Sequence, residues 1–432
     1  MTAEEFERNF AEIHPGFTPQ EALVEANRCL FCFDAPCTNA CPTHIDVPRF
    51  IKKISTGNLR GSAQTILDAN VLGLSCSRVC PVDVLCEGAC VMHRYNKEPI
   101  EIGRLQRHAM DYFYTRVGRL PEPPVFNGGR VACIGAGPAS LACAAELRRH
   151  GFAVTVFDKR EQAGGLNTYG VAEYKFRPVD SQKEVELIRS LGVEFRVGVE
   201  VGNDVSLDEL EREFDVIFLG AGLGPTQHLK IPGEDLTGVF DALQFIAAYK
   251  TAMPLPIGRR VVVIGGGNTA IDAATASRRL GADEVVMLYR RGEKQMPAFE
   301  FEFRHAKQDG VGFLWRSQPV AIYGNGHVEV IECQRTGPDD NSNFRVECDT
   351  VITSIGQSRL AALLSQCRGV ELRNGNVMVD AQTGRTTNPK YFAGGDCVNG
   401  GREVVDAVAE GKRAARGIIQ GFSVKAAEAC HG

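Results

Sequence analysis

Apolar and polar positions follow two different periodicities along the chain. In residues 1 to about 120, apolar residues recur at helical spacing, which predicts a mostly helical segment. The clearest helical stretches are residues 18–32, 58–73 and 102–117. The first of these begins with Thr18 as a capping residue and Pro19 at the first helical position, as helix starts commonly do.

From Arg130 onward, short apolar runs alternate with helical stretches. Residues 130–160 predict a strand, a glycine turn, a helix and a second strand, and residues 259–291 repeat that order. This order is the pattern of a parallel nucleotide-binding unit. Residues 388–418 predict a further strand, a glycine turn and a helix that returns to the first unit.

Proline- and glycine-rich segments indicate how the chain divides. Residues 120–129 separate the helical part from the first nucleotide-binding unit, and residues 249–258 form a hinge before the second. We expect an α/β protein with an N-terminal α-helical domain and two Rossmann-like dinucleotide-binding domains, the second inserted in the first. The expected domains are residues 1–125, residues 126–256 together with 359–432, and residues 257–358.

Composition and charge narrow the partners. The 432 residues are 44% hydrophobic and 23% charged, as in ordinary globular proteins. The net charge of −5 argues against nucleic acid as a partner. No run approaches the ~18 apolar residues that a membrane helix needs, and residues 1–10 have no apolar signal-peptide core. We therefore expect no membrane association.

Eight of the fifteen cysteines lie between Cys29 and Cys90. They form two groups, each containing a Cys-Pro pair: Cys29, Cys32, Cys37 and Cys41, and Cys76, Cys80, Cys86 and Cys90. Close cysteine spacing with Cys-Pro pairs is typical of loops that bind [4Fe–4S] clusters, where one cysteine often crosses to a second cluster.

Two other uses of these cysteines fit less well. Disulfides suit small secreted domains, and zinc sites favour paired Cys-x2-Cys motifs, of which only Cys29–Cys32 is one. We therefore expect two [4Fe–4S] clusters and, because such clusters need a reducing compartment, a cytoplasmic protein. Eight cysteines can supply two sets of four, and their spacing leaves the grouping open.

The first glycine motif predicts an FAD site. Gly135 makes the tight turn, and Gly137 lets the backbone approach a pyrophosphate at the N-terminus of the next helix. Asp158 ends the next strand, where a carboxylate can bind ribose hydroxyls. The Gly164–Gly165 pair and the Gly394–Asp396 turn complete a set typical of FAD in two-domain reductases. Tight packing alone explains the three features together less well.

The second glycine motif predicts a nicotinamide nucleotide site. It comprises Gly265, Gly267, Asn268 and Thr269, between a strand and a helix. The next strand runs into Arg290 and Arg291, where sites for NAD usually have a carboxylate. A guanidinium pair can bind a 2′-phosphate, and the alternative is a pair of solvated surface charges. The expected nucleotide is NAD(P)H, with NADPH favoured.

This scheme needs no catalytic side chain. Hydride passes from the nicotinamide to the flavin, because the cofactors carry the chemistry, and the flavin supplies single electrons to the clusters. The second nucleotide-binding domain has no Cys-x-x-C motif, so a redox dithiol of the thioredoxin reductase kind is not expected.

The order of the motifs resembles a known family. The segments CLFCFDAPCTNACP, CSRVCPVDVLCEGAC, GAGPAS, GGGNTA and YFAGGDCVNGG are similar to the small subunit of glutamate synthase. They are also similar to the N-terminal half of dihydropyrimidine dehydrogenase and to its separate bacterial electron-input subunit. The resemblance covers nearly the whole chain and implies an iron–sulfur flavoprotein that passes electrons from NAD(P)H to a partner.

The resemblance also implies which residues bind each cluster. One cluster would be bound by Cys29, Cys32, Cys37 and Cys90. The other would be bound by Cys41, Cys80, Cys86 and Gln106. Cys76 is then left free. Dihydropyrimidine dehydrogenases have a glutamine at the position of Gln106, whereas glutamate synthase small subunits usually have a glutamate there.

For the flavin, the resemblance implies contacts beyond the glycine turns. The full expected set is Gly135, Gly137, Pro138, Ala139, Asp158, Gly165, Leu166, Lys175, Gly395, Asp396, Val404 and Val405. The family usually has proline and arginine after the Gly-Gly pair, where this chain has Ala172 and Lys175.

Together these features predict the electron-input subunit of a dihydropyrimidine dehydrogenase. Its partner would be an FMN-containing subunit that reduces uracil or thymine, since nothing in this chain resembles that half of the enzyme. The alternatives are the small subunit of glutamate synthase and a stand-alone reductase that feeds a ferredoxin.

Overall fold

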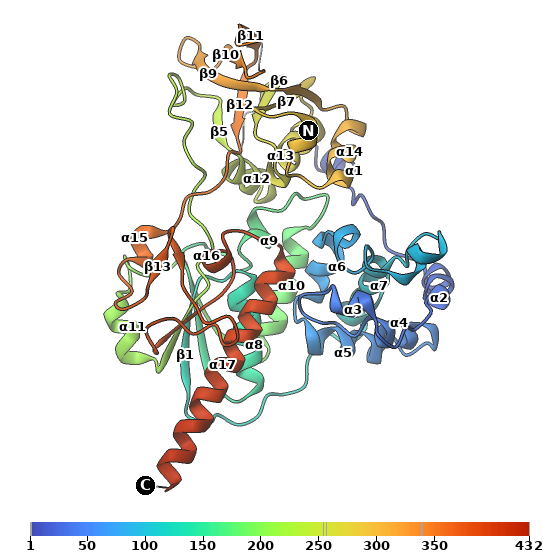
Figure 1. Cartoon of the computed structure of the whole chain (residues 1–432), viewed down its shortest axis with the longest axis vertical. Coiled ribbons are helices and arrows are strands. Elements are labelled where there is room, and N and C mark those ends of the chain that lie inside the picture. The colour runs from blue at the N-terminus through green and yellow to red at the C-terminus, as the bar shows by residue number, and fades with distance from the viewer. Residues whose placement is uncertain (1, 254, 256, 338–339, 432) are drawn as a thin grey trace. The chain divides into compact units, whose positions relative to one another are not determined.

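The computed structural model describes residues 2–253, 255, 257–337 and 340–431. It divides into two compact units, each assembled from several stretches of the chain (Figure 1). The larger unit comprises His14–Thr168, Val179–Leu223 and Arg359–Gly432. The smaller unit comprises Met1–Ile13, Tyr169–Pro178 and Gly224–Ser358. None of the helices in the described ranges is long and apolar enough to cross a lipid bilayer.

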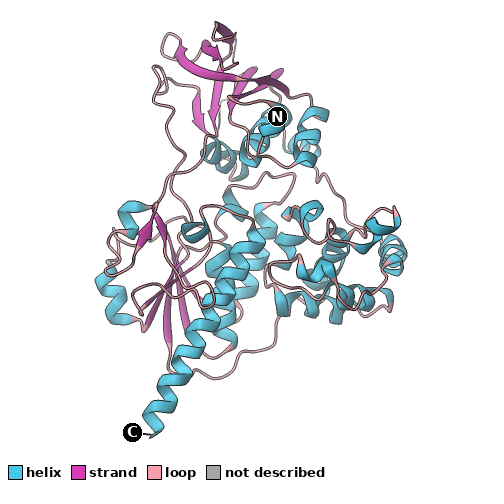
Figure 2. Cartoon of the chain, viewed as in Figure 1, coloured by secondary structure: helices cyan, strands magenta, loops and turns pink. Residues whose placement is uncertain are grey.

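Helices form the N-terminal part of the larger unit (Figure 2). They are α2 (Pro19–Arg28), α3 (Pro36–Asn39), α4 (Val47–Ser55), α5 (Leu59–Ala69), α6 (Gly73–Val79) and α7 (Ile102–Arg116). The predicted start of α2 is confirmed, because the Thr18 hydroxyl accepts from the backbone N–H of Glu21 and the Glu21 carboxylate accepts from that of Thr18. The predicted helices at 58–73 and 102–117 are confirmed as α5 and α7.

The rest of the larger unit contains a five-stranded parallel sheet and a two-stranded antiparallel sheet of β13 (Leu372–Arg373) and β14 (Asn376–Val377). The strand order of the five-stranded sheet is β15-β4-β1-β2-β3. The strands are β1 (Arg130–Ile134), β2 (Ala153–Asp158), β3 (Glu194–Val197), β4 (Val216–Leu219) and β15 (Tyr391–Ala393). Its helices are α8 (Pro138–Arg149), α9 (Leu166–Tyr169), α10 (Pro178–Arg189), α11 (Leu207–Glu213), α15 (Ala361–Leu364), α16 (Asp396–Asn399) and α17 (Val404–His431). Because β15 pairs with β4, the C-terminal segment completes the sheet begun at β1, as the sequence predicted.

The smaller unit contains the second parallel sheet, with strand order β5-β12-β6-β7-β8. Those strands are β5 (Val239–Asp241), β6 (Arg260–Ile264), β7 (Glu284–Tyr289), β8 (Gly312–Trp315) and β12 (Thr350–Thr353). An antiparallel sheet adds β9 (Ser317–Tyr323), β10 (Val330–Arg335) and β11 (Asn343–Glu347). The helices are α1 (Ala3–Asn9), α12 (Ala242–Lys250), α13 (Asn268–Arg279) and α14 (Glu300–Gln308). Phe245, Val263 and Ile271 are fully buried in its core.

Three stretches fall in a different unit from the one we expected. Residues 224–256 belong to the smaller unit, because β5 pairs with β12 and α12 packs against α13. The described residues of the predicted hinge at 249–258 therefore belong to that unit, and residues 254 and 256 lie outside the described ranges. Residues 1–13 and the strap at Tyr169–Pro178 also belong to the smaller unit. Contacts with residues distant in the chain decide these cases, and local sequence patterns carry no sign of them.

Candidate functional site

Four cysteines from separate segments of the larger unit line one cavity. Cys29 ends α2, Cys32 lies in the loop that follows, Cys37 lies on α3, and Cys90 precedes a short 3-10 helix. The cavity wall also includes the apolar side chains of Val47, Ile51, Met92, Ile100 and Ile102. Burial raises the pKa of the Cys37 thiol to about 12, so this thiol needs a nearby metal or cation to ionise. The sulfur donors and the apolar wall fit an iron–sulfur cluster.

Four other cysteines, Cys41, Cys76, Cys80 and Cys86, gather near the C-terminal end of α6. Cys80 is the C-cap residue of this helix. A hydrogen bond with the Cys76 thiol, burial, and the nearby Cys86 and Cys41 thiols together raise the pKa of Cys80 well above its usual value. These four sulfurs therefore lie within electrostatic reach of one another.

Gln106 lies beside α6 on the neighbouring helix α7 and is 7% exposed. Its side-chain Nε2 donates a hydrogen bond of 2.8 Å to the backbone carbonyl of Gly73, the first residue of α6. Because a carbonyl can only accept, this bond fixes the orientation of the amide and leaves Oε1 as its possible metal ligand.

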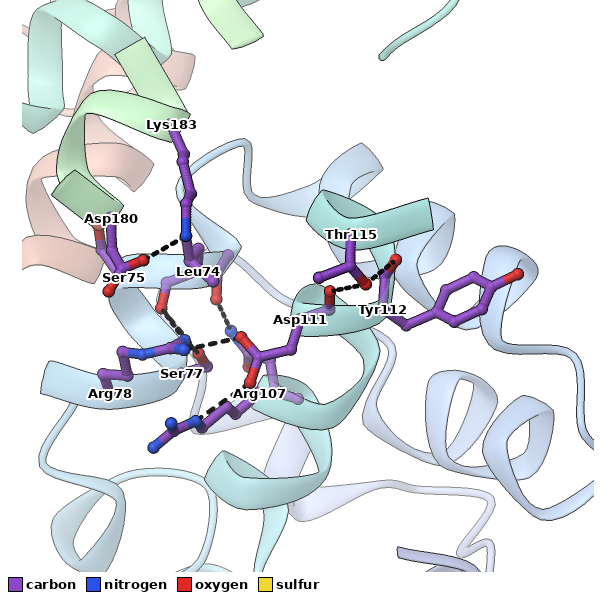
Figure 3. A network of polar contacts seen from close by, with 12 residues as sticks. Leu74, Ser75, Ser77, Arg78, Arg107, Asp111, Tyr112, Thr115, Asp180 and Lys183 are labelled. Carbon is purple, nitrogen blue, oxygen red and sulfur yellow. Dashed lines mark hydrogen bonds and ion pairs between the residues drawn. The ribbon is translucent and has the colours of Figure 1, made fainter. Parts of the chain in front are cut away.

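The packing of α6 against α7 is reinforced by charged side chains. Arg78 of α6 pairs with Asp111 of α7 at 2.7 Å, and Arg107 pairs with the same carboxylate at 3.3 Å (Figure 3). The Arg78–Asp111 pair joins α6, which ends at Cys80, to α7, which carries Gln106, and the Arg107–Asp111 pair lies within α7.

A single metal ion and a four-iron cluster place different demands on their ligands. Among the described residues, no three His, Cys, Asp or Glu side chains converge closely enough to hold one ion. A zinc ion would need four ligands at about 2.0–2.3 Å from one point. A four-iron cluster distributes its ligands over four separate iron atoms, so its ligands need not converge on one point.

The first glycine turn has the geometry of a pyrophosphate site. Gly135 has φ +90°, and a Cβ there would lie 2.6 Å from the carbonyl oxygen of Gly220, so glycine is required. Gly137 is the N-cap of α8, and no described atom lies within 4 Å of where its Cβ would be. No described side chain caps α8, so its first amides remain available to a phosphate. Pro138 and Ala139 form the first turn of this helix.

Asp158 lies at the end of β2, beside this turn. One carboxylate oxygen accepts a 2.7 Å hydrogen bond from the backbone N–H of Ala136, and the other accepts a 2.8 Å bond from that of Arg160. The carboxylate is therefore held in place at the position where a ribose would bind, with further lone pairs for its hydroxyls.

The other predicted flavin residues of the larger unit lie close to the same turn. A Cβ on Gly165 would lie 2.7 Å from Cα of Gly137, and one on Gly395 would lie 3.0 Å from Cβ of Ala139. Leu166, directly after Gly165, is 37% exposed although it is apolar. The structure thus brings the Gly-Gly pair and the Gly-Gly-Asp turn together with the first glycine motif.

The GGD turn continues into the C-terminal helix. Burial raises the pKa of Asp396, and its carboxylate accepts a hydrogen bond from the backbone N–H of Arg402. The backbone N–H of Gly395 donates to Glu410 of α17 at 2.6 Å. Val404 and Val405 form the first turn of α17.

The second glycine turn repeats the geometry of the first. Gly265 has φ +150°, and a Cβ there would lie 2.2 Å from the carbonyl oxygen of Ser354. Gly267 is the N-cap of α13, with no described side-chain cap and no described atom within 4 Å of where its Cβ would be. The Asn268 side chain instead accepts a 3.0 Å bond from the N–H of Phe299. Thr269 follows it in the first turn and is half-buried.

Arg290 and Arg291 lie directly after β7, at the carboxyl end of the strand next to this turn. Both side chains are at least partly exposed. Within the part of the chain that the structure describes, neither guanidinium group forms an ion pair. They are therefore available for an anion at this edge of the sheet.

Lys175, which we expected to contact the flavin, forms two buried ion pairs. It belongs to the smaller unit, where its ammonium group pairs with Asp272 at 2.6 Å and with Glu302 at 2.8 Å. Its contact with the flavin stays a prediction. Local sequence patterns hold no sign of the pairing, since Asp272 and Glu302 lie 97 and 127 positions further along the chain.

A buried carboxyl group that sequence reasoning missed lies between α10 and α6. Glu184 is 1% exposed and accepts 2.9 Å hydrogen bonds from the backbone N–H groups of Leu74 and Ser75. The Ser75 hydroxyl also bonds to Glu184 and accepts a 2.8 Å bond from Asn167, two residues after Gly165. These contacts connect the cysteine-bearing helix α6 to the segment after the Gly-Gly pair. Residues over 90 positions apart form them, so no local pattern reveals them.

Two family descriptions match the chain. Residues 6–117 match "dihydropyrimidine dehydrogenase domain II, 4Fe-4S cluster", and residues 129–411 match "pyridine nucleotide-disulphide oxidoreductase". The second match spans more than half of the chain. The chain belongs to the pyridine nucleotide-disulphide oxidoreductase family. With its iron–sulfur domain, it is an NAD(P)H-dependent flavin iron–sulfur oxidoreductase, which confirms the resemblance seen in the sequence.

Relatives of two named functions are similarly close to this member of the family. It is 37% identical to the glutamate synthase [NADPH] small chain of Halomonas elongata, over 96% of this chain and 94% of that protein. It is 34% identical to the NAD-dependent dihydropyrimidine dehydrogenase subunit PreT of Salmonella typhimurium, over 94% of this chain and 96% of that one.

Solved structures show the same fold at lower identity. The thioredoxin reductase of T. acidophilum superposes with a TM-score of 0.58 at 23% identity, over 68% of this chain and 98% of that one. Mycobacterium tuberculosis FprA in complex with NADPH superposes with a TM-score of 0.56 at 20% identity, over 70% of this chain and 86% of that one. These similarities confirm the expected nucleotide-binding fold.

Proposed function

We propose that this oxidoreductase is the electron-input subunit of a larger enzyme. It oxidises NAD(P)H at FAD and passes the electrons through two [4Fe–4S] clusters to a partner subunit. The observation that carries this proposal is a combination of two features in one chain. Two glycine turns each lead into a helix whose N-terminus has no described side-chain cap, and two groups of cysteines gather in the N-terminal part. Neither feature alone would require both hydride and single-electron chemistry.

FAD would be held by the first glycine turn. The first amides of α8, after Gly137, would bind its pyrophosphate, and Asp158 would bind its ribose. The turn at Gly395 and Asp396 and the first turn of α17 would complete the site. Bound FAD supplies the conversion of a two-electron hydride input into single electrons.

The clusters would be held by the two groups of sulfur donors. The cavity lined by Cys29, Cys32, Cys37 and Cys90 would hold one cluster. Cys41, Cys80, Cys86 and Gln106 would hold the other. Arg78, Arg107 and Asp111 would keep α6 and α7 at the spacing that this second site requires.

The nicotinamide nucleotide would bind at the second glycine turn. The amides of α13 would bind its pyrophosphate, and the side chains of Arg290 and Arg291 would bind a 2′-phosphate. This arrangement favours NADPH over NADH.

For the electron acceptor, Gln106 supports dihydropyrimidine dehydrogenase. The Nε2 group of its buried amide donates to the Gly73 carbonyl, so Oε1 remains available as a neutral oxygen ligand for iron. The partner would then be an FMN-containing subunit that reduces uracil or thymine to the 5,6-dihydro form. Glutamate synthase is the second candidate. It is supported by the arginine pair and by the 37% identity to a small chain named for NADPH.

Purification of the tagged chain from its host under anaerobic conditions tests these alternatives. Uracil-dependent NAD(P)H oxidation by a co-purifying FMN subunit would support the dihydropyrimidine dehydrogenase proposal. Oxidation that depends on glutamine and 2-oxoglutarate would assign the chain to glutamate synthase. Reduction of ferredoxin alone, without any partner, would leave a stand-alone reductase.

A further inference from the structure

Cys76 lies at the second cluster position although the proposed set of four ligands does not use it. It is on α6 and is 3% exposed. The side-chain amide of Asn70, which is fully buried, donates a hydrogen bond to the Cys76 sulfur at 3.2 Å. An amide N–H directed at sulfur stabilises the negative thiolate form, which is the form that binds metal.

Helix geometry places Cys76 beside the proposed ligands. Cys76 and Cys80 are four residues apart at the C-terminal end of α6, so their side chains lie on the same face. The thiols of Cys76, Cys41 and Cys86 all lie near enough to act on the Cys80 thiol. The structure therefore gathers four sulfurs where the second cluster needs only three sulfurs and Gln106.

Gln106 approaches the same helix. Its amide donates to the carbonyl of Gly73, three residues before Cys76 and therefore close to it around the helix axis. An amide oxygen is a weaker ligand for iron than a thiolate. A thiolate in the same neighbourhood can thus compete for the fourth position.

We propose that Cys76 is an alternative fourth ligand of the second cluster, which binds iron when Gln106 does not. This inference rests on the two clusters of the proposed function. In the exchange, the bond from iron to the amide oxygen is lost and a bond from iron to the Cys76 sulfur is formed. The thiol proton is released, and no electron is transferred. The cluster site then carries one more negative charge, which makes reduction of that cluster less favourable.

Single and double substitutions test this proposal. The variants are Gln106→Leu, Cys76→Ala and the two combined, each purified anaerobically. Iron, acid-labile sulfide, FAD and the electron paramagnetic resonance (EPR) spectrum of the reduced protein are measured. We expect eight irons per chain in Gln106→Leu, with an altered EPR signal for one cluster. We expect eight irons and an unchanged spectrum in Cys76→Ala, and four irons in the double variant.

The FAD content shows which variants have folded. Four irons in a Gln106→Leu protein that retains one FAD would overturn the proposal. Retention of eight irons by the double variant would also overturn it, because another group would then be the ligand. If Gln106→Leu does not fold, Gln106→Ser is the second variant, with the same expected iron content.

Wild-type protein with fewer than eight irons would instead contradict the two-cluster part of the proposed function. Cys143→Ala, which changes a fully buried cysteine of α8, is the control and should keep eight irons.

Discussion

The ammonium group of Lys175 lies 2.6 Å from a carboxylate oxygen of Asp272, and Glu302 lies 2.8 Å from the same ammonium group. The three side chains are only 8–10% exposed. Burial alone would lower the pKa of Lys175, but the two carboxylates outweigh it and raise that pKa. Asp272 is on α13, which begins at the second glycine turn. The ion pair between Lys175 and Asp272 therefore holds the strap at Tyr169–Pro178 against this helix.

Lys175→Met should destabilise the smaller unit. The substitution leaves two carboxylates buried without their cation, which costs about 3–5 kcal/mol of unfolding free energy. Arg304→Met is the matched control, because Arg304 and Glu300 form an exposed pair on the same helix as Glu302. The control should change stability by less than about 1 kcal/mol. Denaturant unfolding of both variants measures the difference, and equal effects would show that the buried pairs contribute little.

Glu184 should make stability depend on pH. Burial raises the pKa of its carboxyl to about 7. Hydrogen bonds from Ser75 and Leu74 and the positive charge of Arg78 lower this pKa, but burial outweighs them. Burial and the nearby Glu184 carboxylate in turn raise the pKa of the Tyr114 hydroxyl well above its usual value. Since the folded protein holds the Glu184 proton more tightly than the unfolded chain does, the contribution of Glu184 to stability falls as the pH rises from its unfolded pKa to about 7.

Glu184→Gln should remove this pH dependence. Between pH 6 and pH 8 the wild-type protein should lose about 1 kcal/mol more unfolding free energy than the variant. Glu186→Gln is the control, because Glu186 lies on the same helix and its side chain is 64% exposed. The difference from wild type should be constant with pH for this control. A constant difference for Glu184→Gln as well would contradict the assigned pKa.

Replacement of Arg290 and Arg291 by glutamine should change nucleotide preference. Hydrogen bonds to a charged phosphate contribute about 1.5–3 kcal/mol, so the KM for NADPH should rise roughly 10- to 100-fold. The KM for NADH, which lacks the 2′-phosphate, should change less than about threefold. Steady-state reduction of a dye acceptor gives both constants, with Arg304→Gln as the exposed control. An equal rise for both nucleotides would exclude specific recognition of the 2′-phosphate.

Two glycines of α17 offer a matched pair of substitutions. A Cβ on Gly411 would lie 2.0 Å from the carbonyl oxygen of Ala139 in the flavin turn, whereas no described atom lies within 4 Å of one on Gly421. Gly411→Ala should cost about 1–3 kcal/mol and reduce the FAD content. Gly421→Ala should be neutral or stabilise the protein by up to about 1 kcal/mol. Thermal unfolding and flavin absorbance distinguish the two, and normal FAD content in Gly411→Ala would show that α8 and α17 can separate without loss of the site.

Local patterns predicted the parts of the fold that short segments determine. Thr18 and Pro19 mark the start of α2, and the glycines at 135 and 265 mark turns that only glycine can adopt. The insertion of the second nucleotide-binding domain in the first was predicted from the strand that begins at Tyr391, which pairs with β4 of the first sheet. These features depend on neighbouring residues, which a sequence displays directly.

Contacts between distant segments could not be predicted in this way. Lys175 follows the Gly-Gly pair closely, so the sequence indicated a flavin contact, but its charge is neutralised by Asp272 and Glu302. The local sequence around Glu184 is typical of an exposed helical position, and only its contacts with Leu74 and Ser75 of α6 bury it. The smaller compact unit resumes at Gly224 and not at residue 257 for the same reason, because β5 pairs with β12.

Metal and flavin analysis of the anaerobically purified chain tests the central claim most directly. Iron, acid-labile sulfide, zinc and extracted flavin are measured per chain in the same preparation. The account predicts eight irons, eight sulfides and one FAD, with no stoichiometric zinc. Zinc in place of iron, or FAD without iron, would contradict the claim that this chain converts hydride input into single electrons carried by two clusters.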